Sequence, residues 1–104
     1  MSKGISKPAL PTLTERDLRE QIRDLCKLFG WQFWFCWTSL HSPRGMTDLI
    51  LCRPPRLIFA ELKSDTGKLT ASQQEWADLL RACLGVEYYC WKPSDFQEIV
   101  SKLR

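Results

Sequence analysis

Histidine is almost absent from this sequence, and the cysteines show no metal-binding spacing. The chain of 104 residues has one histidine and five cysteines, and no two cysteines are separated by only two or three residues. Zinc sites combine Cys and His ligands at such short spacings, so we expect no zinc. Scattered free thiols are typical of a reducing compartment, where cysteine serves as a small apolar residue. The sequence therefore predicts a cytoplasmic protein.

Long apolar runs are also missing. No stretch approaches the roughly 20 apolar residues of a membrane-spanning helix, and no apolar run precedes Leu25, so we expect neither a membrane partner nor a signal peptide. The formal net charge is only +3, a mild excess that is compatible with a phosphate-bearing partner. Apolar residues make up 44% of the chain, enough for a packed core. We expect one domain over residues 12–104, after a flexible arm at residues 1–11.

Apolar spacing predicts seven elements. A helix is expected from about Thr14 to Phe29, an aromatic strand over 31–37, strands over 48–52 and 57–63, a helix from Thr70 to Gly85, a strand over 86–91, and a last helix capped by Ser94. The apolar stripe expected for the second helix consists of Trp76, Leu79, Leu80 and Cys83. The order α-β-β-β-α-β-α predicts an α/β fold, with a mixed sheet flanked by helices.

Two carboxylates are expected to face each other across a hairpin. Pro54 and Pro55 must lie in its turn, because proline cannot donate to a β-ladder. Opposed residues then have numbers that sum to 109, which pairs Asp48 with Glu61. Cross-strand Cβ atoms lie roughly 4.5–5.5 Å apart, where like charges repel. A divalent cation such as Mg²⁺ or Mn²⁺ would remove that conflict, because hard cations prefer oxygen ligands.

Strand alternation adds an amine to the acidic pair. Leu57, Phe59, Glu61 and Lys63 are expected on one face of their strand, and Ile58, Ala60 and Leu62 on the other. An ammonium beside the acidic pair can stabilise negative charge that develops on a phosphoryl group, or orient an attacking water. The alternative is a surface ion pair between Glu61 and Lys63, since E-x-K occurs often by accident.

An ordered set of motifs resembles the VRR-NUC branch of the PD-(D/E)XK nucleases over residues 12–100. The motifs are Gly45-Met46-Thr47-Asp48, Phe59-Ala60-Glu61-Leu62-Lys63 and Gly67-Lys68-Leu69-Thr70, followed by Gln73 and Trp76. The resemblance implies a restriction-endonuclease-like α-β-β-β-α-β core with a C-terminal helix, and metal-dependent cleavage of DNA. Small stand-alone phage members of the branch are most similar, which implies a phage-encoded or bacterial protein. Thr47 departs from the pattern, because the family usually has a proline there.

The resemblance also implies roles for individual residues. Asp48, Glu61 and the backbone carbonyl of Leu62 would hold Mg²⁺ or Mn²⁺, and Lys63 and Gln73 would orient the attacking water. The family's first-helix glutamate corresponds to Glu15, which shares a side with the apolar stripe, whereas Glu20 points nearly opposite. Glu15 would act on the metal directly or through water. Two alternatives involve helix capping, because Glu15 can close a box with Thr12 and Gln73 can close one with Thr70.

Several basic or polar residues are candidates for DNA contact. Arg44 and Lys68 are expected in loops beside the site. Arg16, Arg19, Arg23 and Lys27 recur at three- or four-residue spacing and form a basic ridge, either for phosphates or as a solvated face that pairs with Glu20 and Asp24. The loop residues His41 and Ser42 complete the set, although a single loop histidine is more often structural.

The resemblance implies a homodimer that cuts four-way Holliday junctions, because the stand-alone members resemble junction resolvases. A two-fold dimer would place two sites for paired cuts. Two alternatives stay open. One is a non-cleaving module that binds DNA with a nuclease-like fold. The other is a nuclease with another nucleic-acid substrate, although no separate recognition domain is visible.

Overall fold

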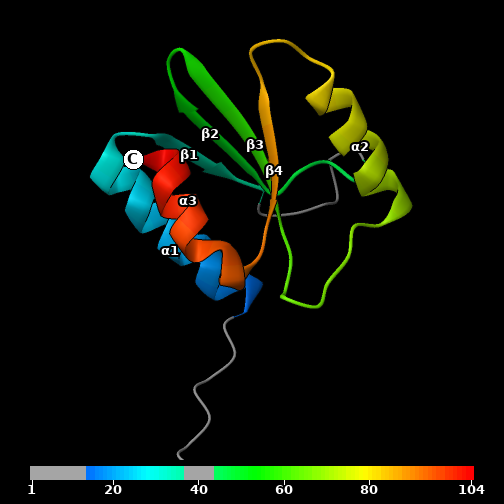
Figure 1. The fold of residues 1–104 in the computed structure, drawn as a ribbon, viewed down its shortest axis with the longest axis horizontal. Coiled ribbons are helices and arrows are strands. Elements are labelled where there is room, and N and C mark those ends of the chain that lie inside the picture. Colours follow the sequence, from blue (N-terminus) through cyan, green and yellow to red (C-terminus); the bar gives the residue numbers. More distant parts are fainter. Residues whose placement is uncertain (1–13, 37–43) are drawn as a thin grey trace, which may run out of the picture.

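A computed structural model of the chain describes residues 14–36 and 44–104. Its elements are α1 (Glu15–Phe29), β1 (Gln32–Phe35), β2 (Leu49–Arg53), β3 (Arg56–Leu62), α2 (Ala71–Arg81), β4 (Glu87–Trp91), the 3₁₀ turn η1 (Pro93–Asp95) and α3 (Phe96–Leu103) (Figure 1). The predicted order of helices and strands is confirmed. The expectations for the arm at residues 1–11 and for Trp37 lie outside the described residues. No described helix has the length and apolar character to cross a membrane.

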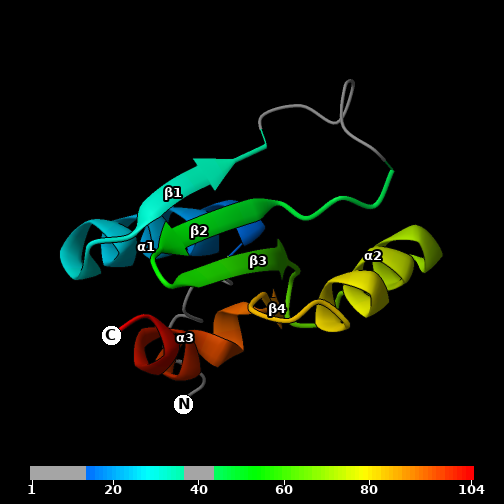
Figure 2. The ribbon, with the colours of Figure 1, turned by 90° about the horizontal axis from the view of Figure 1, so that it is seen from above.

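The four strands form one mixed sheet in the order β1-β2-β3-β4 (Figure 2). The first three strands are antiparallel neighbours, and β4 pairs in parallel with β3. The predicted hairpin register is confirmed: Arg53 pairs with Arg56, and the ladder runs on to Leu49 opposite Ala60. One further step along this register brings Asp48 opposite Glu61.

The main core lies between the sheet and the two helices α1 and α3, which cover the same face (Figure 1). Alternation along β3 aims Ile58, Ala60 and Leu62 into this core, as predicted, and all three are buried. They pack with buried residues of the other elements, namely Leu18, Ile22, Cys26, Trp31, Leu49, Leu51, Trp91, Ile99 and Leu103. Helix α2 lies on the opposite face and packs beside β4. The residues that alternate with these core positions on β3, including Glu61, therefore point to the face that α2 covers.

The apolar stripe predicted for α2 is partly wrong. Ala77 is the buried residue of this helix, whereas Leu79 and Cys83 are exposed. A narrow contact with β4 explains the difference, because a small residue lets the helix approach the strand and leaves its neighbours outside. The helix also ends at Arg81 rather than at Gly85. The cap predicted at Ser94 is wrong as well, because Ser94 lies inside η1, whose first backbone N–H groups are satisfied by carboxylates of two aspartates.

Two arginines at the hairpin tip tie the sheet to the ends of α1 and α3. Arg53 donates to the carbonyls of Phe29 at 2.9 Å and Leu103 at 3.2 Å, and Arg56 donates to Lys102 at 2.8 Å. Both guanidinium groups lie over the ring of Trp31, at 4.6 and 4.9 Å from its centroid. The last carbonyls of a helix lack partners within the helix and carry partial negative charge, so these cations stabilise both helix ends.

The ion pair between Arg56 and Glu87 makes a pH-dependent contribution to stability. Its two hydrogen bonds are both 2.7 Å long, and Tyr89 donates a third to Glu87 at 2.7 Å. Hydrogen bonds from Arg56 lower the pKa of Glu87 below its usual 4.5. A depressed native pKa means that this stability is present above pH 4.5 and is lost as pH falls through the native value.

Replacing Glu87 with glutamine is therefore expected to cost about 1 kcal/mol near pH 7, since the pair is bidentate but partly exposed. The cost should shrink as the pH falls below 4.5 and through the lowered native pKa of Glu87, because the wild-type carboxylate then becomes protonated. Urea unfolding from pH 3 to 7 measures both effects. Glu98→Gln, an exposed carboxylate on α3, is the matched control. A penalty for Glu87→Gln that does not change with pH would contradict the role of charge in this pair.

Candidate active site

Asp48 and Glu61 meet where β2 begins and β3 ends. The Asp48 carboxylate accepts a hydrogen bond of 2.9 Å from the backbone N–H of Leu62, which orients it across the hairpin. Glu61 is only 2% exposed, and its Oε2 accepts from the Gln73 amide at 3.3 Å. Its Oε1 is buried and has no hydrogen-bond partner among the described residues. An unpartnered carboxylate oxygen in the interior is costly, so this position favours a proton or a cation.

The electrostatic environment of Glu61 also disfavours the charged form of its carboxyl group. The pKa of Glu61 is raised from 4.5 to about 9, mainly by burial and then by the neighbouring Asp48 carboxylate. The charge of Glu15 acts in the same direction, and that of Lys63 opposes it. All three predicted charged neighbours therefore lie close enough to influence Glu61. In the absence of a cation, the protein holds Glu61 protonated at neutral pH.

Gln73 closes the predicted helix cap and also contacts Glu61, whereas its role in orienting water stays a prediction. Its side-chain oxygen accepts from the Thr70 backbone N–H at 2.9 Å, and the Thr70 hydroxyl accepts from the Gln73 backbone N–H at 3.2 Å. This closes the capping box that starts α2. The remaining amide nitrogen points to Glu61. The cap thus fixes the orientation of the amide, and the amide holds the buried carboxylate.

The loop before Asp48 is fastened to the start of α2. The indole N–H of Trp76 donates to the backbone carbonyl of Arg44 at 2.9 Å. Gly45 adopts a φ of +82°, and a Cβ at this position would lie 2.5 Å from backbone atoms of Ser72. Thr47, in place of the family's proline, is buried, and its hydroxyl contacts the Leu49 carbonyl at 3.5 Å. The glycine therefore permits the close approach that puts Gln73 next to Glu61.

Replacing Gly45 with alanine should destabilise the protein by about 2–4 kcal/mol, because it combines an unfavourable φ with a backbone clash. Gly85 is the matched control: its φ is +79°, but nothing lies within 4 Å of a Cβ there. Gly85→Ala should cost only about 1 kcal/mol. Chemical denaturation of both variants measures the difference. Equal costs would show that the loop does not pack against α2 as described.

Glu15 opens α1 and is not its cap. The capping box at the start of α1 joins Thr14 and Asp17, with both hydrogen bonds at 3.0 Å, whereas Thr12, the partner in the predicted alternative, lies outside the described residues. Glu15 instead lines a hollow of about 250 Å³ together with Asp48 and Leu62. The other lining residues are Arg19, Phe35 and Cys36. The helix start is therefore satisfied by Asp17, and Glu15 is left to face the acidic pair.

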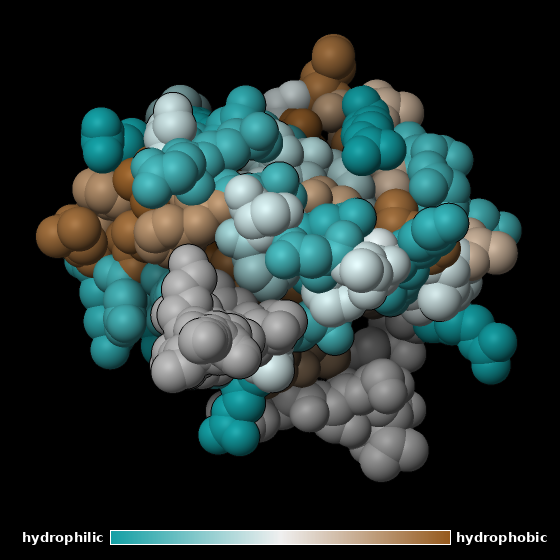
Figure 3. All heavy atoms as spheres, turned by 60° about the horizontal axis from the view of Figure 1, so that its bottom comes forward, coloured by the Kyte–Doolittle hydropathy of each residue, from teal (hydrophilic) through white to brown (hydrophobic). Residues whose placement is uncertain are grey.

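The structure gives less detail on the other predicted site residues. Lys63 is half-buried, and its backbone N–H extends the β3–β4 pairing by donating to Trp91 at 3.0 Å. Arg44 and Lys68 are exposed on the loops that flank the site. His41 and Ser42 lie outside the described residues. Figure 3 turns the lower side of Figure 1 forward and shows hydrophilic side chains over the middle of that face.

Sequence reasoning missed Tyr88. Its hydroxyl is buried without a hydrogen-bond partner in the described part of the chain. Burial raises the pKa of Tyr88 to about 12, and the charges of Glu61 and Asp48 contribute to this shift. The phenol therefore lies within electrostatic range of the acidic pair. Parallel pairing of β3 with β4 puts Tyr88 opposite Phe59, on the same face as Glu61. That pairing joins strands far apart in the sequence, so no local signal marks Tyr88.

The residues present fit a hard divalent cation. Mg²⁺ is commonly bound by one or two carboxylates and keeps several water ligands. Asp48 and Glu61 supply two carboxylates, one of them with a buried oxygen that lacks a partner. Within residues 14–36 and 44–104, no three His, Cys, Asp or Glu side chains gather into a metal-binding group. The fit therefore rests on two carboxylates, with backbone carbonyl oxygens and water as the other available ligands.

The sheet order, with α1 and α3 on one face and α2 on the other, is an α/β fold that is similar to that of a VRR-NUC domain. A solved structure titled "VRR_NUC domain" matches with a TM-score of 0.68 at 13% sequence identity, covering 88% of this chain and 100% of that chain. No family model and no curated protein matches the sequence. The resemblance indicated by the motifs is thus confirmed for the fold.

Proposed function

We propose that this protein is a metal-dependent endonuclease that hydrolyses DNA phosphodiesters. The observation that carries the proposal is the buried Glu61 carboxylate beside Asp48, with one oxygen that has no partner in the described structure. Two charged carboxylates this close destabilise the fold unless a proton or a cation neutralises one of them, and a bound cation would give the pair a use. The VRR-NUC fold supports the same activity, because the motifs of this chain that resemble the nucleases carry both acids.

Each of the proposed site residues would have a separate role in the reaction. Asp48, Glu61 and the Leu62 carbonyl would hold Mg²⁺ or Mn²⁺, with Glu15 acting directly or through water. The cation, when bound, acts as a Lewis acid and lowers the pKa of water. Gln73 holds Glu61 in place through the hydrogen bond already described. Lys63 would stabilise the negative charge that develops on the phosphoryl oxygens.

The reaction itself is an in-line displacement at phosphorus. A water oxygen forms the new bond to phosphorus while the bond to the 3′ oxygen breaks. The water gives up a proton to solvent and the 3′ oxygen takes one from solvent, which leaves a 5′ phosphate and a 3′ hydroxyl. Lys63 and Gln73 would orient the water. Arg44 and Lys68, both exposed beside the site, would bind the DNA backbone, together with His41 and Ser42. Such contacts release counterions, so binding should weaken steeply with salt.

A homodimer acting on four-way junctions is the specific form of the proposal. Leu79 and Leu84 are both exposed, at the end of α2 and in its following turn, and two apolar side chains in one region could form the centre of an interface. A two-fold dimer through this region would present two sites to one junction. Leu84→Glu is expected to shift the protein from dimer to monomer in sedimentation velocity. Leu28→Glu is the same substitution at another exposed leucine, which lies on α1, and it should leave the dimer intact.

The cleavage test compares a four-way junction, a splayed arm, duplex DNA and single-stranded DNA of matched sequence. Each substrate is incubated with Mg²⁺, Mn²⁺ or EDTA. We expect metal-dependent cleavage with the junction cut fastest, and no products in EDTA. Tight binding without products under every metal would contradict the nuclease proposal. Equal rates on all four substrates would contradict junction selectivity alone.

A further inference from the structure

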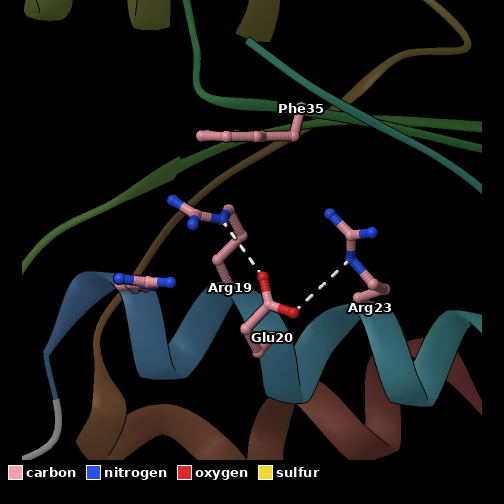
Figure 4. Close-up of a pocket in the computed structure, with 5 residues that line it drawn as sticks. Arg19, Glu20, Arg23 and Phe35 are labelled. Carbon is pink, nitrogen blue, oxygen red and sulfur yellow. Dashed lines mark ion pairs between the residues drawn. The ribbon is translucent and has the colours of Figure 1, made fainter. Parts of the chain in front are cut away.

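A second hollow, of about 660 Å³, lies between α1 and β1 (Figure 4). Its lining consists of Arg16, Arg19, Glu20, Arg23 and Phe35. Arg19 and Phe35 also line the hollow at Asp48, so the two spaces are adjacent and share a wall. A chain molecule bound at the acidic pair would therefore continue into this basic hollow, which we call the arginine pocket.

Two of the three arginines that line the pocket, Arg19 and Arg23, do not stand free on an open ridge as their spacing suggests. Arg19 lies 3.9 Å from the centroid of the Phe35 ring, and Arg23 lies 5.0 Å from that of Phe33. Their side chains are 18% and 35% exposed. Figure 4 shows both reaching from α1 towards β1. Stacking on a ring restrains a guanidinium plane and leaves its N–H edge available, which suits bidentate binding of a phosphate.

Glu20 satisfies these arginines incompletely. It lies 3.5 Å from Nε of Arg19 and 3.8 Å from Nε of Arg23, and it is half-exposed. Both Nε atoms are buried, and neither has a hydrogen-bond partner among the described residues. Buried donors without partners are rare in native proteins and call for a ligand or water. With Arg16, the pocket also holds three cations against one carboxylate.

We propose that the arginine pocket binds backbone phosphates of the nucleic-acid strand on one side of the scissile phosphate. This inference rests on the proposed function, because it places the reaction at Asp48 and Glu61. In the free protein, Glu20 then holds the two guanidinium groups in place. A bound phosphate accepts hydrogen bonds from their N–H groups instead. A phosphate offers the geometry that the loose Glu20 contacts lack, and the wall shared with the acidic hollow favours a polynucleotide over a small free anion.

Binding is tested in an Asp48→Asn background with EDTA, so that no cleavage interferes. Fluorescence anisotropy of labelled DNA is followed over a range of salt. Arg19→Gln and Arg23→Gln should each weaken binding about tenfold, the size expected for a charge-assisted hydrogen bond. Each should also reduce the salt slope by about 0.7–0.9. Lys27→Gln, an exposed cation on the same helix outside the pocket, should stay within twofold of the parent.

Arg19→Lys distinguishes a loss of phosphate binding from a general loss of folding. It keeps the charge and much of the packing but removes the planar guanidinium group. We expect an affinity between those of the parent and Arg19→Gln. Glu20→Gln should tighten binding by about two- to fivefold by removing a competing charge. Asp24→Asn, one turn further along α1, should have a smaller effect. An Arg19→Lys variant that binds like the parent, or a Glu20→Gln variant that binds more weakly, would overturn the proposal.

Neutral methylphosphonate linkages, introduced one at a time, show which phosphates are bound. At one or two positions on one side of the cut, the linkage should weaken the parent but have no further effect on Arg23→Gln. The proposal would be overturned if the effects of the linkage and of Arg23→Gln were independent at every position. It would also be overturned if inorganic phosphate bound as tightly as DNA. If the arginine variants lose affinity but the wild-type chain never cleaves DNA, the nuclease proposal fails and phosphate binding stands. Cleavage with unchanged KM in the variants would refute the pocket alone.

Discussion

Replacing Lys63 with alanine is expected to lower the rate of DNA cleavage by about a hundred- to a thousandfold, with little change in DNA affinity. The expected size is that of losing one preorganised group that stabilises transition-state charge. The side chain lies close enough to Glu61 to lower its pKa, so the ammonium belongs to the electrostatic field of the acidic pair. Single-turnover cleavage of the preferred substrate at saturating enzyme isolates the chemical step from binding.

Lys68→Ala is the matched control for Lys63→Ala. Lys68 is an exposed lysine five positions further along the chain, and we expect it to contact backbone phosphate. Its loss should therefore weaken binding and reduce the salt slope while leaving the single-turnover rate at saturation nearly unchanged. A Lys63→Ala variant that cleaves at the wild-type rate would remove Lys63 from the reaction. Similar losses of rate in both variants would indicate a general electrostatic effect rather than a specific role.

Replacing Glu61 with glutamine is expected to separate the metal's effect on stability from its effect on chemistry. At a concentration 100 times its Kd, a ligand that binds only the native state adds about 2.7 kcal/mol, which shifts the Tm of a domain this small by on the order of 10 °C. Mg²⁺ or Mn²⁺ should produce such a shift in the wild-type protein. Glu61→Gln should abolish the shift, because an amide is a poor replacement for a carboxylate ligand.

The same variant has an expected pH signature in EDTA. The native pKa of Glu61 is raised from 4.5 to about 9, so the native state holds a proton that the unfolded state releases. This contribution to stability is fully present below pH 4.5 and is lost progressively as the pH rises towards 9. Glu61→Gln cannot ionise, so its stability should decline less over this range and exceed that of the wild type at pH 8.

Thermal denaturation at pH 5 and pH 8, with and without Mg²⁺, tests both statements. Glu75→Gln, an exposed carboxylate on α2, should retain the metal shift and the wild-type pH dependence. A metal shift that survives in Glu61→Gln would show that the cation binds elsewhere. A wild-type protein in EDTA that becomes more stable from pH 5 to pH 8, relative to Glu61→Gln, would show that Glu61 is ionised in the native state.

Local rules predicted the hairpin well because its register has a local cause. Proline lacks an N–H, so Pro54 and Pro55 had to occupy the turn, and the turn sets every pair along the two strands. The observed pairing of Arg53 with Arg56 follows. The cap formed by Thr70 and Gln73 was equally accessible, since it depends on two residues in one turn of helix.

Local rules failed where two candidates had the same pattern or where burial depended on a neighbour. Thr12–Glu15 and Thr14–Asp17 have the same capping spacing, and the helix start at Glu15 selects the second. The apolar stripe of α2 appeared complete in sequence, yet only Ala77 is buried, because the helix touches the sheet along one narrow line beside β4. The arginine spacing on α1 likewise could not reveal that Arg19 would stack on Phe35.

The sequence by itself determined the order of elements, the hairpin register and the approach of Asp48 to Glu61, because each depends on turn chemistry and strand alternation over a short stretch of chain. Only the tertiary structure decided that Gln73 reaches Glu61, that Tyr88 lies within electrostatic range of the acidic pair, and that α1 and β1 enclose an arginine pocket. Those contacts join residues that are distant in sequence, and their geometry depends on how the helices pack against the two faces of the sheet.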